Sequence, residues 1–326
     1  MSRYLRQITL PEVGDAGQAR LTAAHALVVG AGGLAAPVLQ YLAGAGVGRL
    51  TIVDPDRVEL SNLHRQTLFT EADQGRPKAE AAAAFCTALN SDVQARAVTA
   101  QLDPANTPAL IGGVDLVLDC TDSLAAKYIL SDACMKAGLP MFSASVLGLG
   151  GYAAGFGGGA PSYRALFPEM PETAETCASA GVLGPVVGMI GSLQAQMVMG
   201  WLLGLTPSPL GQFLRYDGAA MRFSSFRFDG APEPKQGPRF IATAQITPED
   251  QVIDLRPASE APVPAAPHAT RRNAGDTAPL QADPARRLVL ACRSGLRAAR
   301  AARHLPAGWP GNVVLVAAGD PADSTD

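Results

Sequence analysis

Short hydrophobic runs alternate with helix-like patterns along most of the chain. Residues 26–29 predict a buried parallel strand, the apolar-periodic segment that follows to about Leu42 predicts a helix, and residues 49–53 predict a second strand. The pattern then repeats, with strands predicted at 93–99, 115–119 and 140–145 and helices predicted from Lys78 and over 124–136. Such repetition predicts an open, mostly parallel α/β sheet with helices on both faces, where ligands bind at the carboxyl ends of the strands.

The segments after residue 145 break this rhythm. Residues 185–203 carry no charge and nearly reach the length of a membrane span. Because glycine and polar residues interrupt them without basic flanks, we predict a fully buried core helix, with a membrane span as the alternative. The glycine-rich residues 147–159 predict strands or loops in close backbone contact, and 160–184 predict a long loop. Residues 212–227 alternate around Asp217-Gly218 and predict a hairpin.

The stretch 229–239 is rich in proline, glycine and charge and predicts a domain boundary. Hydrophobic runs at 251–255, 288–291 and 313–316 then outline a small α/β module. We therefore predict a main domain over 1–230, a linker over 231–245 and a small module over 246–326.

Composition narrows the class of protein. With 326 residues, 48% of them hydrophobic, 17% charged and a net charge of -3, the chain resembles an ordinary soluble protein and gives no support for nucleic-acid binding. Five scattered cysteines without a CxxC spacing fit a reducing compartment and offer no zinc-ligand pattern. The first residues carry no apolar signal segment, so we expect a cytoplasmic protein.

A glycine turn follows the first strand. Gly30, Gly32 and Ala35 form a GxGxxA pattern that leads into the first helix, as in a Rossmann-like nucleotide-binding unit. Glycines let the backbone approach a phosphate, and the helix N-terminus supplies aligned N–H donors. Asp54, at the end of the second strand, is placed to accept a ribose hydroxyl. Taken alone, these features predict a nicotinamide-dependent dehydrogenase.

Several charged and polar residues that hydride transfer does not need follow the predicted strands. They are Asp54, Asp56, Asn62, Arg65, Gln66, Lys78 and Asp122. Cations can surround the oxygens of a triphosphate, and carboxylates can hold Mg²⁺ and ribose. The chain has no GxxxxGK[ST] loop, which excludes a P-loop enzyme. The set therefore favours nucleoside-triphosphate chemistry over hydride transfer.

Several motifs in a fixed order resemble one family, the ThiF/MoeB/HesA proteins, prokaryotic relatives of ubiquitin-activating enzymes. The motifs, which lie between about Arg3 and Phe228, are GAGGLAAP, TIVDPDRVELSNLHRQTLF, GRPKAE, LVLDCTDS, CASAGVLGPVVGMIGSLQA and RYDG. The resemblance implies a protein that uses ATP and Mg²⁺ to adenylate the C-terminal glycine of a ubiquitin-like sulfur-carrier protein ending in Gly-Gly, with release of pyrophosphate. It also implies a homodimer and a sulfur donor such as a cysteine desulfurase.

The resemblance also assigns roles by position. Gly30, Gly32 and Gly33 would form the turn beside the phosphates, and Asp54 would bind ribose. Phosphate contacts would come from Asn62, Arg65 and Lys78, Gln66 would also belong to the ATP site, and Asp122 would hold Mg²⁺. Arg6 lies in an arm that reaches the ATP site of the neighbouring subunit. A carboxylate that attacks the α-phosphorus brings two anions together, and cations on both sides relieve their repulsion. No general base is required, because a C-terminal carboxylate is already ionised.

The resemblance also bears on the cysteines. Cys177 occupies the loop position at which some members carry a thiol that binds the carrier covalently; the alternative is an inert residue. Many members hold zinc through two CxxC pairs, but Ser162 and Ala165 replace the first pair and residues 230–239 lack cysteine, so we predict no zinc. The segments VIDLR and VLACRSGLR resemble a shortened rhodanese domain, in which Cys292 would carry sulfur and helix N–H groups would stabilise its thiolate or persulfide.

The leading hypothesis is an adenylyltransferase that acts on the small subunit of molybdopterin synthase, with a sulfur site at Cys292. The sulfur carriers of the thiamine and cysteine pathways are alternatives, because all share this activation chemistry. A scaffold that binds the carrier without catalysis and a nicotinamide oxidoreductase remain as alternatives of other classes.

Overall fold

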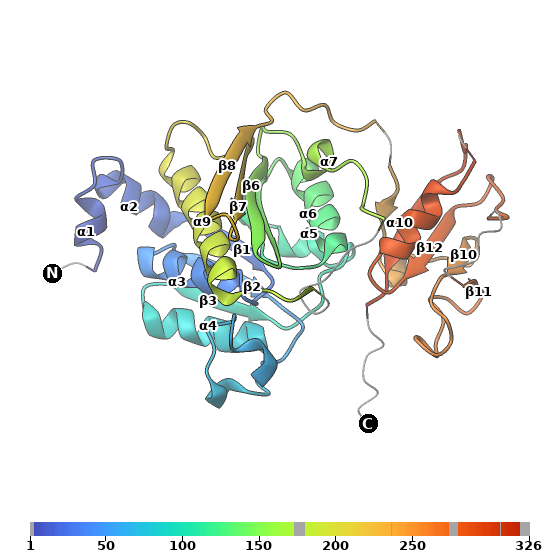
Figure 1. The fold of residues 1–326 in the computed structure, drawn as a ribbon, viewed down its shortest axis with the longest axis horizontal. Helices are drawn as coiled ribbons and strands as arrows, with labels where there is room; N and C mark the ends of the chain where they lie inside the picture. The colour runs from blue at the N-terminus through green and yellow to red at the C-terminus, as the bar shows by residue number, and fades with distance from the viewer. Residues whose placement is uncertain (1–2, 173–179, 236, 274–279, 307, 320–326) are drawn as a thin grey trace.

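The computed structural model describes residues 3–172, 180–235, 237–273, 280–306 and 308–319, and it contains two sheets (Figure 1). The larger has eight strands in the order β3-β2-β1-β4-β5-β6-β7-β8. Its strands are β1 (His25–Val29), β2 (Arg49–Val53), β3 (Gln94–Val98), β4 (Leu116–Asp119), β5 (Pro140–Leu147), β6 (Gly150–Gly157), β7 (Gln212–Asp217) and β8 (Arg222–Arg227). The neighbours within β3-β2-β1-β4-β5 pair in parallel, and the neighbours within β5-β6-β7-β8 pair antiparallel.

Helices cover both faces of this sheet, as the hydrophobic pattern predicts. One face packs against α2 (Gly14–Ala23), α3 (Ala35–Ala45), α4 (Lys78–Leu89) and α9 (Gly184–Leu203). The other face packs against α5 (Thr107–Leu110), α6 (Leu124–Ala137) and α7 (Tyr163–Leu166). Helix α1 (Leu5–Ile8) lies at the end of the molecule away from the second sheet (Figure 1). The short 3-10 helices are η1 (Leu60–Asn62), η2 (Glu71–Asp73) and η3 (Thr243–Gln245).

The second sheet has five parallel strands in the order β11-β10-β12-β13-β9, with α10 (Leu296–Arg303) beside it. Its strands are β9 (Arg239–Phe240), β10 (Gln251–Asp254), β11 (Thr270–Arg271), β12 (Leu288–Cys292) and β13 (Val313–Ala317). The edge strand β9 comes from within the predicted linker. Phe240 of β9 packs beside Gly295, where an added Cβ would lie 2.6 Å from the ring and 3.6 Å from Ala125 of α6. The small module therefore packs against the helix that covers the main sheet.

Three sequence predictions need correction. Helix α9 is only partly buried, because Ser192, Gln196 and Met199 line a second cavity of about 750 Å³. Its other face packs on α3, β5 and β6, and among the described residues it is the one helix long and apolar enough to cross a membrane. The hairpin turn is longer than Asp217-Gly218: Asp217 pairs with Arg222, and the Asp217 carboxylate accepts the amides of Ala219 and Ala220. The predicted long loop contains α7.

Candidate functional site

A cavity of about 560 Å³ opens at the carboxyl ends of β1, β2, β4 and β5. This is the edge at which a parallel sheet binds ligands, because the chain order reverses between β1 and β4 and leaves a crevice. Of the residues predicted from sequence for the ATP site, ten line the cavity: Gly30, Gly32, Gly33, Asp54, Asp56, Asn62, Arg65, Gln66, Lys78 and Asp122. The fold thus brings together residues that are up to 92 positions apart (30 to 122) in the chain.

The glycine turn is required by close packing as well as by a ligand. Gly30 has a φ of 89°, and a Cβ added there would lie 2.9 Å from the carbonyl oxygen of Cys120. A Cβ on Gly33 would lie 2.7 Å from Val187 of α9 and 3.0 Å from the carbonyl oxygen of Arg65. At Gly32, which also lines the cavity, a Cβ would make only an ordinary contact with Gln66. The turn therefore packs closely against Cys120, Arg65 and Val187, and it forms part of the cavity wall.

Asp54 organises the turn from the end of β2. Its carboxylate accepts the amide of Ala31 at 2.7 Å through Oδ2 and the amide of Asp56 at 2.8 Å through Oδ1. Burial raises the pKa of Asp54, although these two hydrogen bonds and the charge of Lys78 oppose the rise. Each carboxylate oxygen has a second lone pair, so the group can still accept a ribose hydroxyl.

Cationic and amide side chains also line the cavity. Lys78, at the start of α4 and largely buried, donates from Nζ to Asp56 Oδ2 at 2.9 Å. Arg65 donates from Nη1 to the carbonyl oxygen of Ser61 at 3.2 Å and lies 2.8 Å from His64 Nε2. The Gln66 side chain is buried, and its Oε1 has no hydrogen-bond partner. A buried amide oxygen without a hydrogen-bond partner costs free energy, so binding of a ligand that donates a hydrogen bond to it is favoured here.

Asp122 follows β4 at the mouth of the cavity, and its residue is exposed to solvent. The next residue, Ser123, caps α6 by accepting the amide of Ala126 at 3.3 Å. Mg²⁺ prefers oxygen ligands and is often held by one or two carboxylates together with substrate phosphates. Asp122 fits this requirement, and within the described residues no cluster of three or more His, Cys, Asp or Glu side chains offers an all-protein metal site.

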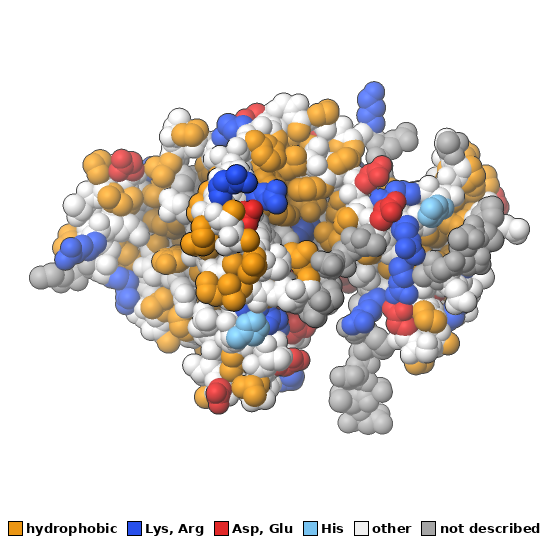
Figure 2. Space-filling model, in the orientation of Figure 1, with side chains coloured by type: hydrophobic (Ala, Val, Ile, Leu, Met, Phe, Trp, Pro, Cys, Tyr) orange, Lys and Arg blue, Asp and Glu red, His pale blue; other side chains and the backbone are white. Residues whose placement is uncertain are grey.

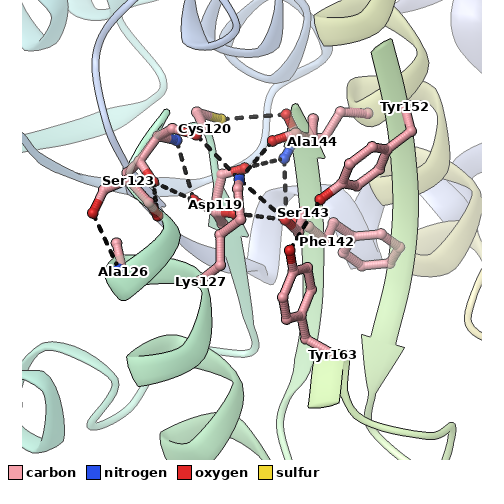
Figure 3. A network of polar contacts seen from close by, with 12 residues as sticks. Asp119, Cys120, Ser123, Ala126, Lys127, Phe142, Ser143, Ala144, Tyr152 and Tyr163 are labelled. Atoms are coloured by element: carbon pink, nitrogen blue, oxygen red, sulfur yellow. Dashed lines mark hydrogen bonds and ion pairs between the residues drawn. The ribbon is translucent and has the colours of Figure 1, made fainter. Parts of the chain in front are cut away.

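Sequence reasoning missed a buried polar network below this loop (Figure 3). Lys127 of α6 forms an ion pair with Asp119 at 2.7 Å, and Ser143 donates to the same carboxylate oxygen at 2.6 Å. Burial by itself would lower the pKa of Lys127, but the charge of Asp119, its hydrogen bond and the nearby Tyr163 and Cys120 together outweigh burial, and the pKa lies above its ordinary value. The only sequence signal was a lysine in an apolar helix shortly after an aspartate that ends a strand.

The same network includes a thiol that also lines the cavity. Cys120 donates from Sγ to Gln194 Oε1 at 3.3 Å, and the Gln194 amide donates to the carbonyl oxygens of Asp119 and Phe142, both at 2.9 Å. Burial raises the pKa of Cys120 far above its ordinary value, so the thiol stays protonated. Cys120 is thus a packing residue rather than a nucleophile.

The remaining predicted residues lie elsewhere. Arg6 is exposed on α1 and does not line the cavity of its own chain. Cys177 falls outside the described residues. Cys292 ends β12 in the second sheet, is fully buried, and accepts the amide of Ala298 through Sγ at 3.4 Å. Next to it, Arg297 donates to both carboxylate oxygens of Glu260 and to the carbonyl oxygen of Leu255.

Comparison with known proteins identifies the family. A family model described as "ThiF family" matches residues 4–237. The chain belongs to the ThiF family. This confirms the resemblance found in the sequence, and the fold agrees with it: E. coli MccB in complex with MccA-N7isoASN has a similar structure, with a TM-score of 0.64, 20% sequence identity, and coverage of 72% of this chain and 74% of that chain.

Two curated relatives of this ThiF-family chain are similar in sequence. The SAMP-activating enzyme E1 of Haloferax volcanii is 42% identical over 235 residues, which cover 72% of this chain and 87% of the relative. The adenylyltransferase and sulfurtransferase MOCS3 of Bos taurus is 47% identical over 228 residues, which cover 69% of this chain and 50% of the relative. The match therefore spans about half the length of MOCS3.

Proposed function

We propose that this ThiF-family protein is an ATP-dependent adenylyltransferase that activates the C-terminal carboxylate of a ubiquitin-like sulfur-carrier protein. The observation that carries the proposal is the cavity, where a glycine turn, the cations Arg65 and Lys78 and the carboxylate Asp122 meet. The relatives named adenylyltransferase and SAMP-activating enzyme support it. A nicotinamide cofactor would use the turn and Asp54 but would leave these cations without a role.

The proposed reaction is an in-line displacement. A carboxylate oxygen of the carrier attacks the α-phosphorus of ATP, and the bond from that phosphorus to the bridging oxygen of the β-phosphate breaks. The products are an acyl-adenylate and pyrophosphate, which takes the electron pair of the broken bond. Arg65 and Lys78 would neutralise the approaching anions. Mg²⁺, held by Asp122, would supply further neutralisation of the triphosphate charge.

An exposed apolar surface beside the cavity supports a protein substrate. Hydrophobic side chains gather beside β6–β8 and over part of α9 on one face of the molecule, around a small cluster of basic side chains (Figure 2). Leu147 lines the cavity, and Leu149, Leu183 and Phe223 are about half exposed. The loop between β5 and β6 touches the turn after β7, since the amide of Gly218 donates to the carbonyl oxygen of Leu149 at 2.7 Å. A ubiquitin-like domain that docks here would place its C-terminal tail at the cavity.

We further propose a homodimer. Leu5, Leu10 and Tyr41 are at least half exposed near the second cavity, which Gln7 also lines. An arm that extends to a neighbouring subunit accounts for an exposed Arg6 outside its own cavity. Mixing Arg6→Ala with Asp122→Ala tests this, because each variant alone should be inactive while each mixed dimer has one complete site of its two. After subunit exchange in an equal mixture, about half of the dimers are mixed, so about a quarter of all sites should be active. Absence of recovery after subunit exchange would contradict the dimer model.

Among sulfur carriers, we propose the small subunit of molybdopterin synthase as the substrate, with the thiamine- and cysteine-pathway carriers as alternatives. The decisive assay is ATP–pyrophosphate exchange with a panel of carriers that end in Gly-Gly. Exchange should require one carrier and should be lost in Asp122→Ala, while that carrier without its last glycine gives none. If no carrier promotes exchange although ATP binds, the adenylyltransferase proposal is wrong. Together with a cyanide-labile persulfide on Cys292, that result would favour a carrier-binding or sulfur-relay scaffold.

We propose a sulfur-relay role for the second sheet. The position of Cys292 at the carboxyl end of β12, with an N–H of α10 directed at its sulfur, supports a persulfide there. Because Cys292 is fully buried, loading with sulfur requires the residues around it to move. After incubation with a cysteine desulfurase and cysteine, the wild type should release cyanide-labile sulfur. Cys292→Ser should release none while keeping its exchange activity; release from Cys292→Ser would exclude this site.

A further inference from the structure

The Asp119–Lys127 ion pair joins the end of β4 to α6 (Figure 3), next to Cys120, Thr121 and Ala126, which line the cavity. The two residues are 0% and 1% exposed, and neither lines the cavity. Burial of two charges is expensive, and a well-packed apolar pair often stabilises a core at least as well. The pair is therefore poorly explained by packing alone, and its contacts point to a different role.

The pair fixes Thr121 at three points. Asp119 Oδ1 accepts the amide of Thr121 at 3.1 Å and its hydroxyl at 2.8 Å. Lys127 donates from Nζ to the carbonyl oxygen of the same residue at 3.1 Å. Thr121 lines the cavity and is joined directly to Asp122. The backbone from which the Asp122 side chain extends is thus held by hydrogen bonds to both charges.

The same pair also fixes β5, the next strand at the cavity. Lys127 Nζ donates to the carbonyl oxygen of Ala144 at 2.8 Å, and Ser143 Oγ donates to Asp119 at 2.6 Å. The following residue, Ser145, lines the cavity. With Asp119, Thr121 and Ala144 as acceptors, the ammonium group of Lys127 uses its three N–H donors. One buried cation therefore sets the relative position of β4, α6 and β5.

We propose that Lys127, together with Asp119, is a positioning residue that holds the Asp122 loop in place for metal-bound nucleotide. The inference rests on the proposed function only in taking ATP and Mg²⁺ as ligands; it does not depend on the carrier. Mutation of residues that hold a metal ligand in place through hydrogen bonds commonly lowers metal affinity by about 10- to 100-fold. Loss of the pair should accordingly weaken the binding of ATP in the presence of Mg²⁺ more than the binding of ATP alone.

The test is calorimetric titration with ATP in Mg²⁺ and, separately, in EDTA. Lys127→Met leaves Asp119 buried without its partner and can destabilise the fold. The double variant Asp119→Asn, Lys127→Met removes both charges and avoids this. Lys136→Met, which removes an exposed cation in the last turn of the same helix, is the matched control. Circular dichroism and thermal unfolding establish that each variant is folded.

In the folded double variant, the enhancement of ATP affinity by Mg²⁺ should fall by about tenfold or more, with the affinity in EDTA within about threefold of the wild type. Lys136→Met should retain the full enhancement. A double variant with wild-type enhancement, or a wild type that shows no enhancement, would overturn the inference. A wild type that binds Mg²⁺-ATP but exchanges no pyrophosphate with any carrier would instead refute the proposed function alone.

Discussion

The contact between α3 and α9 gives a prediction that links packing to the cavity. A Cβ on Gly191 of α9 would lie 2.6 Å from Cγ of Pro37 and closer still to the carbonyl oxygen of Leu34. Because carbon atoms pack at about 3.5 Å or more, Gly191→Ala must separate the two helices by roughly 1 Å. Leu34 follows Gly33 and immediately precedes α3. The substitution should therefore disturb the glycine turn as well as the core.

The magnitude follows from two opposing effects. Overpacking in a core costs about 1–3 kcal/mol, and replacement of a helical glycine by alanine returns about 1 kcal/mol. Gly188 of the same helix has nothing within 4 Å of an added Cβ, so Gly188→Ala should only gain stability. Both variants gain the helix contribution, so they should differ by the overpacking cost alone, roughly 1–3 kcal/mol in the free energy of unfolding, or about 2–12 °C in Tm.

Thermal unfolding followed by circular dichroism measures this difference, and calorimetric titration measures the binding of ATP. Gly191→Ala should be the less stable variant and should bind ATP several-fold more weakly than Gly188→Ala, because about 1 Å of displacement at the turn changes its contacts with the phosphates. Equal stability of the two variants would refute the close approach of α3 and α9. Reduced stability with unchanged ATP affinity would refute the link between this packing and the turn.

Three further substitutions test other parts of the structure. Hydrogen bonds from Arg287 lower the pKa of Asp250, so its carboxylate stabilises the fold above about pH 4 and that contribution disappears as the pH falls through the lowered pKa. Asp250→Asn should thus reduce the free energy of unfolding in urea by roughly 1–2 kcal/mol at pH 7 but by much less near pH 2; an equal loss at both would contradict this. Glu233→Ala should cost about 1 kcal/mol in the same assay, because the amide and hydroxyl of Ser162 both lose their acceptor. Ser123→Ala should cost a similar amount by removing the N-cap of α6, whereas Ser123→Asp should restore it.

The strands of the parallel part were predictable because buried strands appear as short apolar runs. The prediction of 49–53 agrees with β2, and the others deviate by a few residues. Helix α2 was not predicted, since Gly14 and Gly17 lower its helix propensity. Its packing on α9 depends on a glycine instead, because a Cβ on Gly17 would lie 2.9 Å from Leu203. Long-range packing of this kind leaves no local signal in the sequence.

The candidate site also contains some residues that could be predicted from sequence and others that could not. The predicted residues follow strand ends, so the order of strands, loops and helices was sufficient to group Asp54, Lys78 and Asp122 around one cavity. The Asp119–Lys127 pair could not be found in this way, because each residue alone resembles an ordinary surface charge. Only the packing of α6 over β4 and β5 reveals that both are buried and bonded to each other.

Helix α6 connects the cavity with the second sheet. Its N-terminal residues Ser123 and Ala126 line the cavity, and the same helix packs against β9. Polar contacts hold the junction: Arg164 of α7 pairs with Asp132 of α6 and donates to the carbonyl oxygen of Pro238, and Arg303 of α10 donates to Met170. A substitution that displaces α6 should therefore disturb both the Asp122 loop and the packing of the second sheet.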